Sequence, residues 1–99
     1  MTRYRKSVDA NQAEVVAALR AAGWTVKDCH ALGGGVFDLA VRKDDFRAWV
    51  EVKMQGEKLT AAEKEFEEWG PGMKFVVYGA EAAVEKLNGL WLWARGGKL

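Results

Sequence analysis

The sequence has very few of the residues from which disulfides and zinc sites are built. It contains one cysteine, Cys29, and one histidine, His30, among 99 residues. A single cysteine forms no internal disulfide, and a structural zinc ion usually needs four Cys or His ligands. Both residues also lack a third partner for nucleophilic catalysis. We interpret them as packing or edge residues and expect neither a disulfide framework nor a zinc site.

Long apolar runs and a strong charge of one sign are also missing. No apolar stretch is long enough to cross a membrane, and none of signal-peptide type follows the basic start of the chain. We therefore expect a cytoplasmic protein (host cytoplasm if the gene belongs to a phage) with no membrane partner. The net charge of +1 neither favours nor excludes nucleic acid as a partner, because a local basic patch matters more than the total.

Length and composition are those of a single folded domain over residues 1–99. Hydrophobic residues make up 49% of the chain and charged residues 29%. This is too apolar for intrinsic disorder, and the length suits one compact domain with a small core.

Hydrophobic periodicity and turn residues predict the element order α-β-β-β-α-β-α, a central mixed β-sheet flanked by helices. The predicted helices cover residues 9–22, 60–69 and 81–87, and the predicted strands cover residues 24–29, 36–42, 46–54 and 73–78. Residues 43–45 are the expected turn of a β-hairpin, and residues 90–93 a short strand or a packed tail. Alternation along the second strand predicts that Phe37, Leu39 and Val41 share one face.

Three polar residues on the predicted hairpin form the chemically informative pattern. Asp38 lies in an otherwise apolar strand, where a lone carboxylate destabilises the fold unless it has a partner or a metal. Glu51 and Lys53 are two residues apart on the partner strand, so both side chains leave the same face. Since the turn brings Asp38 across from Glu51, two carboxylates and one ammonium converge on a small patch of sheet.

These residue types suit phosphodiester hydrolysis assisted by Mg²⁺ or Mn²⁺. Adjacent carboxylates stay ionised best with a cation between them, and Mg²⁺ prefers oxygen ligands and keeps several waters. Asp38, Glu51 and the Val52 carbonyl would supply the protein ligands. Lys53 would orient or deprotonate the attacking water, or stabilise the transition state. The alternative is that these residues merely form a solvated strand face.

The same residues resemble the motifs of the PD-(D/E)XK nuclease superfamily. The likeness is carried by residues 33–41, 49–53 and 58–60. It is greatest to small phage-type and VRR-NUC-like or Holliday-junction-resolvase-like members, and it implies an α/β, restriction-endonuclease-like core. It also implies that Asp38, Glu51 and Lys53 are the motif residues. Glu14 would be the acidic residue of the first helix that reaches the metal or the lysine, with an exposed helix carboxylate as the alternative.

Two positions depart from the pattern of that superfamily. Phe37 stands where the motif has proline, which is not a ligand, so we expect activity to survive. Glu63 stands where many relatives carry glutamine, which leaves the role of this position open.

Six further residues are predicted to contact nucleic acid. They are Arg3, Arg5, Lys6, Gly34, Gly35 and Lys58. The cations are placed to bind phosphates, and the glycines allow a nucleic-acid backbone to approach closely. For each of them a role without ligand contact stays open.

The leading functional prediction is a metal-dependent DNA endonuclease, with branched, flap and four-way junction DNA among the candidate substrates. No small-molecule cofactor is expected beyond the metal. The alternatives are a nuclease-like module that binds nucleic acid or a protein without cutting, and a purely structural module. The alternating apolar residues 90–93 would leave an edge for a homodimer contact, and a two-fold dimer suits a resolvase-like enzyme.

Overall fold

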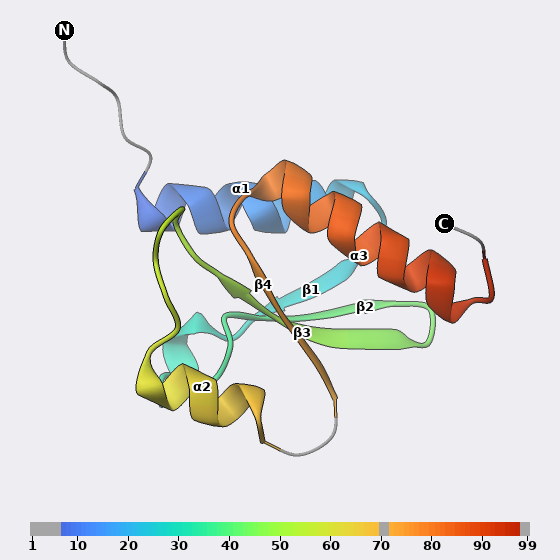
Figure 1. Cartoon of the computed structure of the whole chain (residues 1–99). Helices are drawn as coiled ribbons and strands as arrows, with labels where there is room; N and C mark the ends of the chain where they lie inside the picture. Colours follow the sequence, from blue (N-terminus) through green and yellow to red (C-terminus); the bar gives the residue numbers. More distant parts are fainter. Residues whose placement is uncertain (1–6, 70–71, 98–99) are drawn as a thin grey trace, which may run out of the picture.

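The chain forms a four-stranded mixed sheet with α-helices on both faces (Figure 1). The computed structural model describes residues 7–69 and 72–97. The elements, in chain order, are α1 (Val8–Ala21), β1 (Thr25–Asp28), the 3₁₀ helix η1 (His30–Leu32), β2 (Leu39–Lys43), β3 (Phe46–Val52), α2 (Ala61–Glu67), β4 (Met73–Val77) and α3 (Ala80–Ala94). The predicted order of helices and strands, and the mixed sheet, are confirmed.

The sheet follows the order β1-β2-β3-β4, and its hairpin sets the register of the central strands. β1, β2 and β3 pair antiparallel, and β4 pairs parallel to β3 after the α2 crossover. Lys43 lies opposite Phe46, so Asp44 and Asp45 form the turn, as predicted. The Asp44 carboxylate accepts hydrogen bonds from the Trp91 indole at 3.0 Å and from the Arg95 guanidinium at 3.1 Å. The tip of the hairpin is therefore held against α3.

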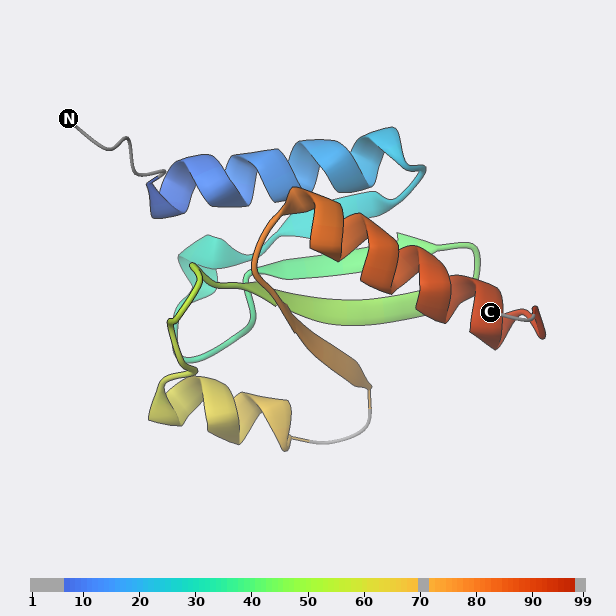
Figure 2. The ribbon, with the colours of Figure 1, turned by 45° about the horizontal axis from the view of Figure 1, so that its top comes forward.

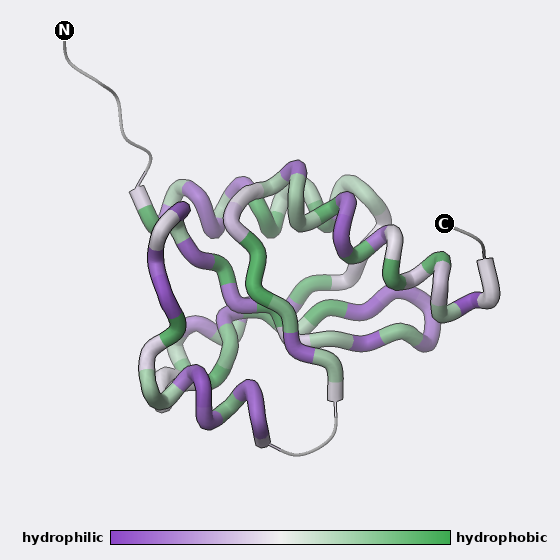
Figure 3. The backbone as a smooth tube through the Cα atoms, viewed as in Figure 1, coloured by the Kyte–Doolittle hydropathy of each residue, from purple (hydrophilic) through white to green (hydrophobic). Residues whose placement is uncertain are grey.

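One face of the sheet packs against α1 and α3 and buries the main core (Figure 2). Side chains four apart on α1, such as Val15 and Leu19, share one helix face and point at alternate residues of the strands. Figure 3 shows hydrophobic residues along most of β4. The buried core residues are Val15, Leu19, Trp24, Val26, Leu39, Val41, Phe46, Ala48, Val50, Val52, Val77, Ala83 and Leu87.

The opposite face is partly covered by α2 through a small aromatic cluster. The Phe66 ring of α2 lies 5.3 Å from Phe37, 5.3 Å from Trp49 and 5.8 Å from Trp69, between ring centroids. The prediction that Phe37 shares a face with Leu39 is wrong, because Phe37 is buried against Phe66 and lies outside the main core. β2 begins only at Leu39, so the strand alternation does not extend back to Phe37.

Residues 90–93 continue the last helix, and the predicted strand or tail is wrong. Ala83, Leu87 and Trp91 recur four residues apart on α3 and pack toward the core, whereas Leu92 and Trp93 are exposed. The alternation of leucine and tryptophan spans only four residues, and the helical repeat extends through three turns. Within residues 7–69 and 72–97, no helix is both long and apolar enough to span a membrane.

A capping box starts α2. The Thr60 hydroxyl accepts a hydrogen bond from the Glu63 N–H at 3.1 Å, and the Glu63 carboxylate accepts one from the Thr60 N–H at 2.8 Å. Two of the N–H groups at the helix start that have no partner within the helix are thereby satisfied. The same bonds fix the side chain of Glu63 at this end of α2.

We expect Thr60→Ala to lower the free energy of unfolding by about 1 kcal/mol, because alanine offers no acceptor to the N-terminal N–H groups of α2. Thr60→Ser keeps the hydroxyl and is the matched control, with stability near that of the parent. Urea denaturation measures both variants. Equal midpoints for the parent and Thr60→Ala would show that the cap contributes nothing.

Candidate active site

Asp38 and Glu51 meet just before β2 begins and close to the end of β3. Leu39 lies opposite Val50 in the hairpin, so the next residues along the two strands, Asp38 and Glu51, lie across from each other. The Asp38 N–H donates to Oε1 of Glu51 at 3.1 Å, and the Val52 N–H donates to Oδ2 of Asp38 at 3.0 Å. Asp38 therefore continues the β2–β3 pairing with its side chain instead of its backbone, and its carboxylate is fixed in orientation.

Glu51 is the most deeply buried acid of the site, with only 3% of its surface exposed. Burial first, and then the neighbouring carboxyls of Glu63 and Asp38, raise its pKa from 4.5 to about 8, against the opposing effect of the Asp38 N–H. Without a bound metal ion, Glu51 therefore holds a proton at neutral pH. The ionised carboxylates of Asp38, Glu51 and Glu63 would together carry more negative charge than the Lys53 ammonium neutralises.

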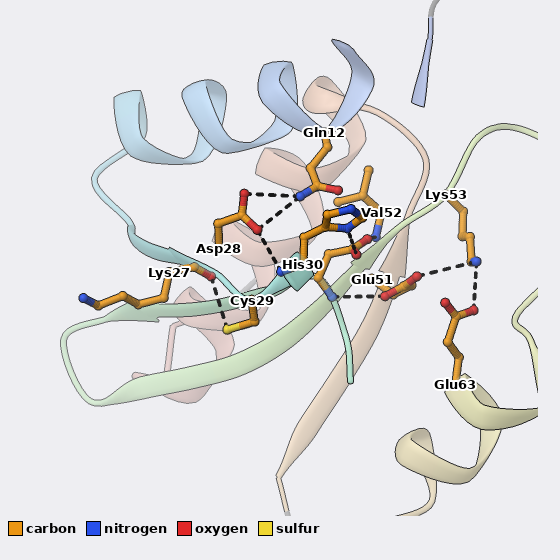
Figure 4. A network of polar contacts seen from close by, with 10 residues as sticks. Gln12, Lys27, Asp28, Cys29, His30, Glu51, Val52, Lys53 and Glu63 are labelled. Carbon is orange, nitrogen blue, oxygen red and sulfur yellow. Dashed lines mark hydrogen bonds and ion pairs between the residues drawn. The ribbon is translucent and has the colours of Figure 1, made fainter. Parts of the chain in front are cut away.

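Lys53 lies between two carboxylates at the end of this strand (Figure 4). Its Nζ lies 2.8 Å from Oε1 of Glu63 and 3.5 Å from Oε2 of Glu51. Burial alone lowers the pKa of Lys53, but the hydrogen bond and charge of Glu63 outweigh it, so the pKa is raised. Burial alone raises the pKa of Glu63. The hydrogen bonds from Lys53 and from the Thr60 N–H outweigh burial, so the pKa of Glu63 is lowered. Lys53 and Glu63 form a charged pair at neutral pH.

The oxygens of Asp38, Glu51 and Val52 form a candidate ligand set for a divalent cation. In a strand, the N–H and C=O of one residue leave the same edge, so the Val52 carbonyl faces the side on which its N–H meets Asp38. Carboxylate and carbonyl oxygens suit hard cations such as Mg²⁺ and Mn²⁺. A cation would also relieve the crowding that raises the pKa of Glu51. The donor set fits such an ion.

The site contains two carboxylates suited to this role rather than three. Across the described residues, no group of three or more His, Cys, Asp or Glu side chains is arranged to bind a metal ion. Glu63, the other nearby acid, is engaged with Lys53 and the start of α2. Water would complete the coordination, as is usual for Mg²⁺.

Glu14 is exposed on α1, and its predicted role at the metal stays a prediction. From the same helix, the side chain of Asn11 reaches the end of β3. The Asn11 amide donates to the Lys53 carbonyl at 3.4 Å. Asn11 is buried, and it links α1 to the strand that carries Glu51 and Lys53.

The residues predicted to bind nucleic acid lie only in part within the described structure. Arg3, Arg5 and Lys6 lie outside the described residues, and Lys58 is exposed in the loop before α2. Gly34 is exposed and Gly35 is partly covered, and both have positive φ, 65° and 85°. A Cβ on Gly35 would collide with the Ala62 carbonyl, so glycine is required there for the loop to pack against α2.

No protein-family model, curated protein or solved structure matches this chain.

Two residues of the site were not assigned to it from the sequence. The role of Glu63 was left open, although its distance from Thr60 already placed it at the end of α2 that follows the active-site strand. His30 was interpreted as an edge residue, yet its Nδ1 lies 3.4 Å from Oδ1 of Asp38. The bond from the His30 N–H to Asp28 at 2.9 Å holds this turn near Asp38. No local sequence signal indicates that contact.

Proposed function

We propose that this chain is a metal-dependent nuclease that hydrolyses phosphodiester bonds in DNA, with Mg²⁺ or Mn²⁺ as its cofactor. The observation that carries the proposal is the meeting of Asp38 and a buried Glu51 across the hairpin, with Lys53 beside them. A binding or structural module gains nothing from crowding two carboxylates in this way. We extend the proposal to a restriction-endonuclease-like core of the PD-(D/E)XK type, which the motif resemblance supports.

The proposed roles follow from charge and position. Asp38, Glu51 and the Val52 carbonyl would hold the cation, which neutralises charge on the scissile phosphate and acidifies water when bound. Lys53 stays protonated because its pKa is raised. It therefore acts as a cation toward a phosphate oxygen, and not as the base that deprotonates water. Asp38 and Glu51 orient the attacking water. Its oxygen bonds to phosphorus and the bond from phosphorus to the leaving oxygen breaks, and the proton that the water releases to solvent is balanced by the proton that the leaving oxygen takes up.

Glu63 is a positioning residue in this scheme. Its carboxylate holds the Lys53 ammonium at 2.8 Å while the capping bond to Thr60 fixes the carboxylate itself. A long lysine side chain would otherwise lose its orientation, since it has several rotatable bonds.

We expect Glu63→Gln to slow cleavage about tenfold. The amide oxygen still accepts from the Thr60 N–H, but the charged bond to Lys53 is lost, and such bonds contribute about 1.5–3 kcal/mol. Single-turnover rates on a DNA substrate measure the change. Glu65→Gln, an exposed position on the same helix, is the control and retains the parent rate. An unchanged rate for Glu63→Gln would remove Glu63 from the site.

The experiment that tests the proposed function is a cleavage assay over duplex, single-stranded, flap and four-way junction DNA, with Mg²⁺, with Mn²⁺ and with EDTA. Metal-dependent cleavage of any of these substrates supports the proposal. Binding without cleavage in every metal would instead favour the catalytically silent module. Three further properties remain predictions: structure-specific cleavage, a cytoplasmic location and a homodimer. The exposed Leu92 and Trp93 of α3 would form the dimer contact.

A further inference from the structure

Three exposed cations gather on the sheet face that carries Glu51, beyond the part covered by α2. They are Lys27 of β1, Arg42 of β2 and Arg47 of β3. With Trp49 and Met73 they line a groove of about 520 Å³. We call this surface the basic groove.

The strand register places these cations side by side. Arg42 and Arg47 are direct partners across the hairpin, and Lys27 lies opposite Ala40, two residues before Arg42. Like charges directly across an antiparallel pair destabilise the sheet. A ligand with negative charge would remove that repulsion.

None of the three cations is neutralised by the part of the chain that the structure describes. The ion pairs there engage Lys53, Arg95 and His30, and none of them includes a side chain of the basic groove. Figure 4 shows the Lys27 ammonium extending away from the polar network, which it joins only through its backbone carbonyl. The basic groove therefore presents three unpaired positive charges to solvent.

An indole ring forms part of the floor of the basic groove. Trp49 is half-buried, and its ring contacts Phe66 edge-on with centroids 5.3 Å apart. This contact fixes the ring in place, while the groove leaves part of it accessible. Cations beside a fixed aromatic ring match the features by which proteins bind single-stranded nucleic acid, in which phosphates meet the charges and a base stacks on the ring.

The basic groove and the proposed active site share one face of β3. Arg47, Trp49 and Glu51 are alternate residues of this strand, and Phe66 of α2 packs against Trp49, which lies between the other two. At about 3.3 Å per residue, Arg47 and Glu51 are about 13 Å apart along the strand. A nucleic-acid strand that runs from the groove past α2 would therefore span this distance with a few nucleotides.

We propose that the basic groove binds a single-stranded segment of nucleic acid and guides it to Asp38 and Glu51. That the bound strand is delivered to a cleavage site rests on the proposed nuclease function, but binding in the groove can be measured without cleavage. The substrate would then be DNA or RNA with an unpaired segment, such as a flap or a frayed end, and not a continuous duplex.

The test compares the parent with the double variant Arg42→Glu/Arg47→Glu. Binding of a fluorescein-labelled 20-nucleotide single strand, as DNA and as RNA, is followed by fluorescence anisotropy in EDTA. We expect at least a tenfold loss of affinity, and a salt dependence whose slope falls by about 0.7 for each phosphate that the variant no longer neutralises. Lys86→Glu reverses one positive charge at an exposed position of α3, on the other side of the sheet, and retains parent affinity. Circular dichroism confirms that the variants fold.

The outcomes separate this inference from the proposed function. Parent-like affinity in the double variant overturns the proposal that the basic groove binds single strands. This holds even if the parent hydrolyses the small diester bis(p-nitrophenyl) phosphate with Mn²⁺. A parent that binds single strands through the groove but hydrolyses neither that diester nor DNA overturns the nuclease and leaves the groove standing. Equal affinity of the parent for a blunt duplex overturns the preference for single strands. Loss of a dimer in the double variant, with unchanged binding of the oligonucleotide, assigns the groove to a second copy of the chain.

Discussion

We expect Asp38→Asn to abolish the proposed metal-dependent cleavage and to leave the fold intact. The asparagine side-chain oxygen still accepts the hydrogen bond from the Val52 N–H, so the start of β2 keeps its geometry. The negative charge that would bind the cation is gone. Removing a partner outside the ligand sphere already costs about 10- to 100-fold in metal affinity or activity. Loss of a ligand therefore predicts a decrease in rate of more than about 100-fold.

The measurement pairs a cleavage rate with a metal-binding readout. We expect Mg²⁺ or Mn²⁺ to raise the melting temperature of the parent by binding the folded state, and Asp38→Asn to lose that rise. Asp45→Asn makes the same chemical change at an exposed residue of the hairpin turn and keeps both the rate and the metal response. An Asp38→Asn protein that cleaves at the parent rate would remove Asp38 from the active site.

The arrangement of Asp38 and Glu51 was predictable because local signals determine it. A short turn after Lys43 sets the hairpin register, and the two-residue period of a strand then places Glu51 and Lys53 on one face. The apolar pattern around Leu39 and Val50 fixes which face is buried, since a slip of one residue would expose both. These features need no information from distant parts of the chain.

The other features of the fold and of the site depend on tertiary contacts that no local sequence pattern encodes. Phe37 leaves the strand pattern because the side chain of Asp38, not its backbone, pairs with β3, and because Phe66 of α2 offers a second apolar surface. Glu63 reaches Lys53 only because the crossover returns α2 to the sheet face that carries Glu51. The helix α1 turns Asn11 toward β3 and leaves Glu14 exposed, a rotation set by packing of the whole helix.

The raised pKa of Glu51 makes the stability of the metal-free protein depend on pH. The carboxyl titrates near 4.5 when exposed and near 8 in the folded protein, first because of burial and then because of Glu63 and Asp38. Between these values the folded state binds more protons than the unfolded state, so stability falls as the pH rises. The slope is at most about 1.4 kcal/mol per pH unit. Glu63, whose pKa is lowered, acts below this window, and Lys53, whose pKa is raised, acts above it.

We therefore expect the melting temperature in EDTA to fall between pH 5 and pH 8, and Glu51→Gln to remove most of that fall, because glutamine carries no proton to lose. Scanning calorimetry in buffers of constant ionic strength measures it. Glu85→Gln, exposed on α3, keeps the slope of the parent. Because a cation competes with the proton on Glu51, the rise in melting temperature caused by Mg²⁺ grows over the same range in the parent and is lost in Glu51→Gln. A parent slope that survives in Glu51→Gln would place the titrating group elsewhere and deprive the proposed cation site of its buried acid.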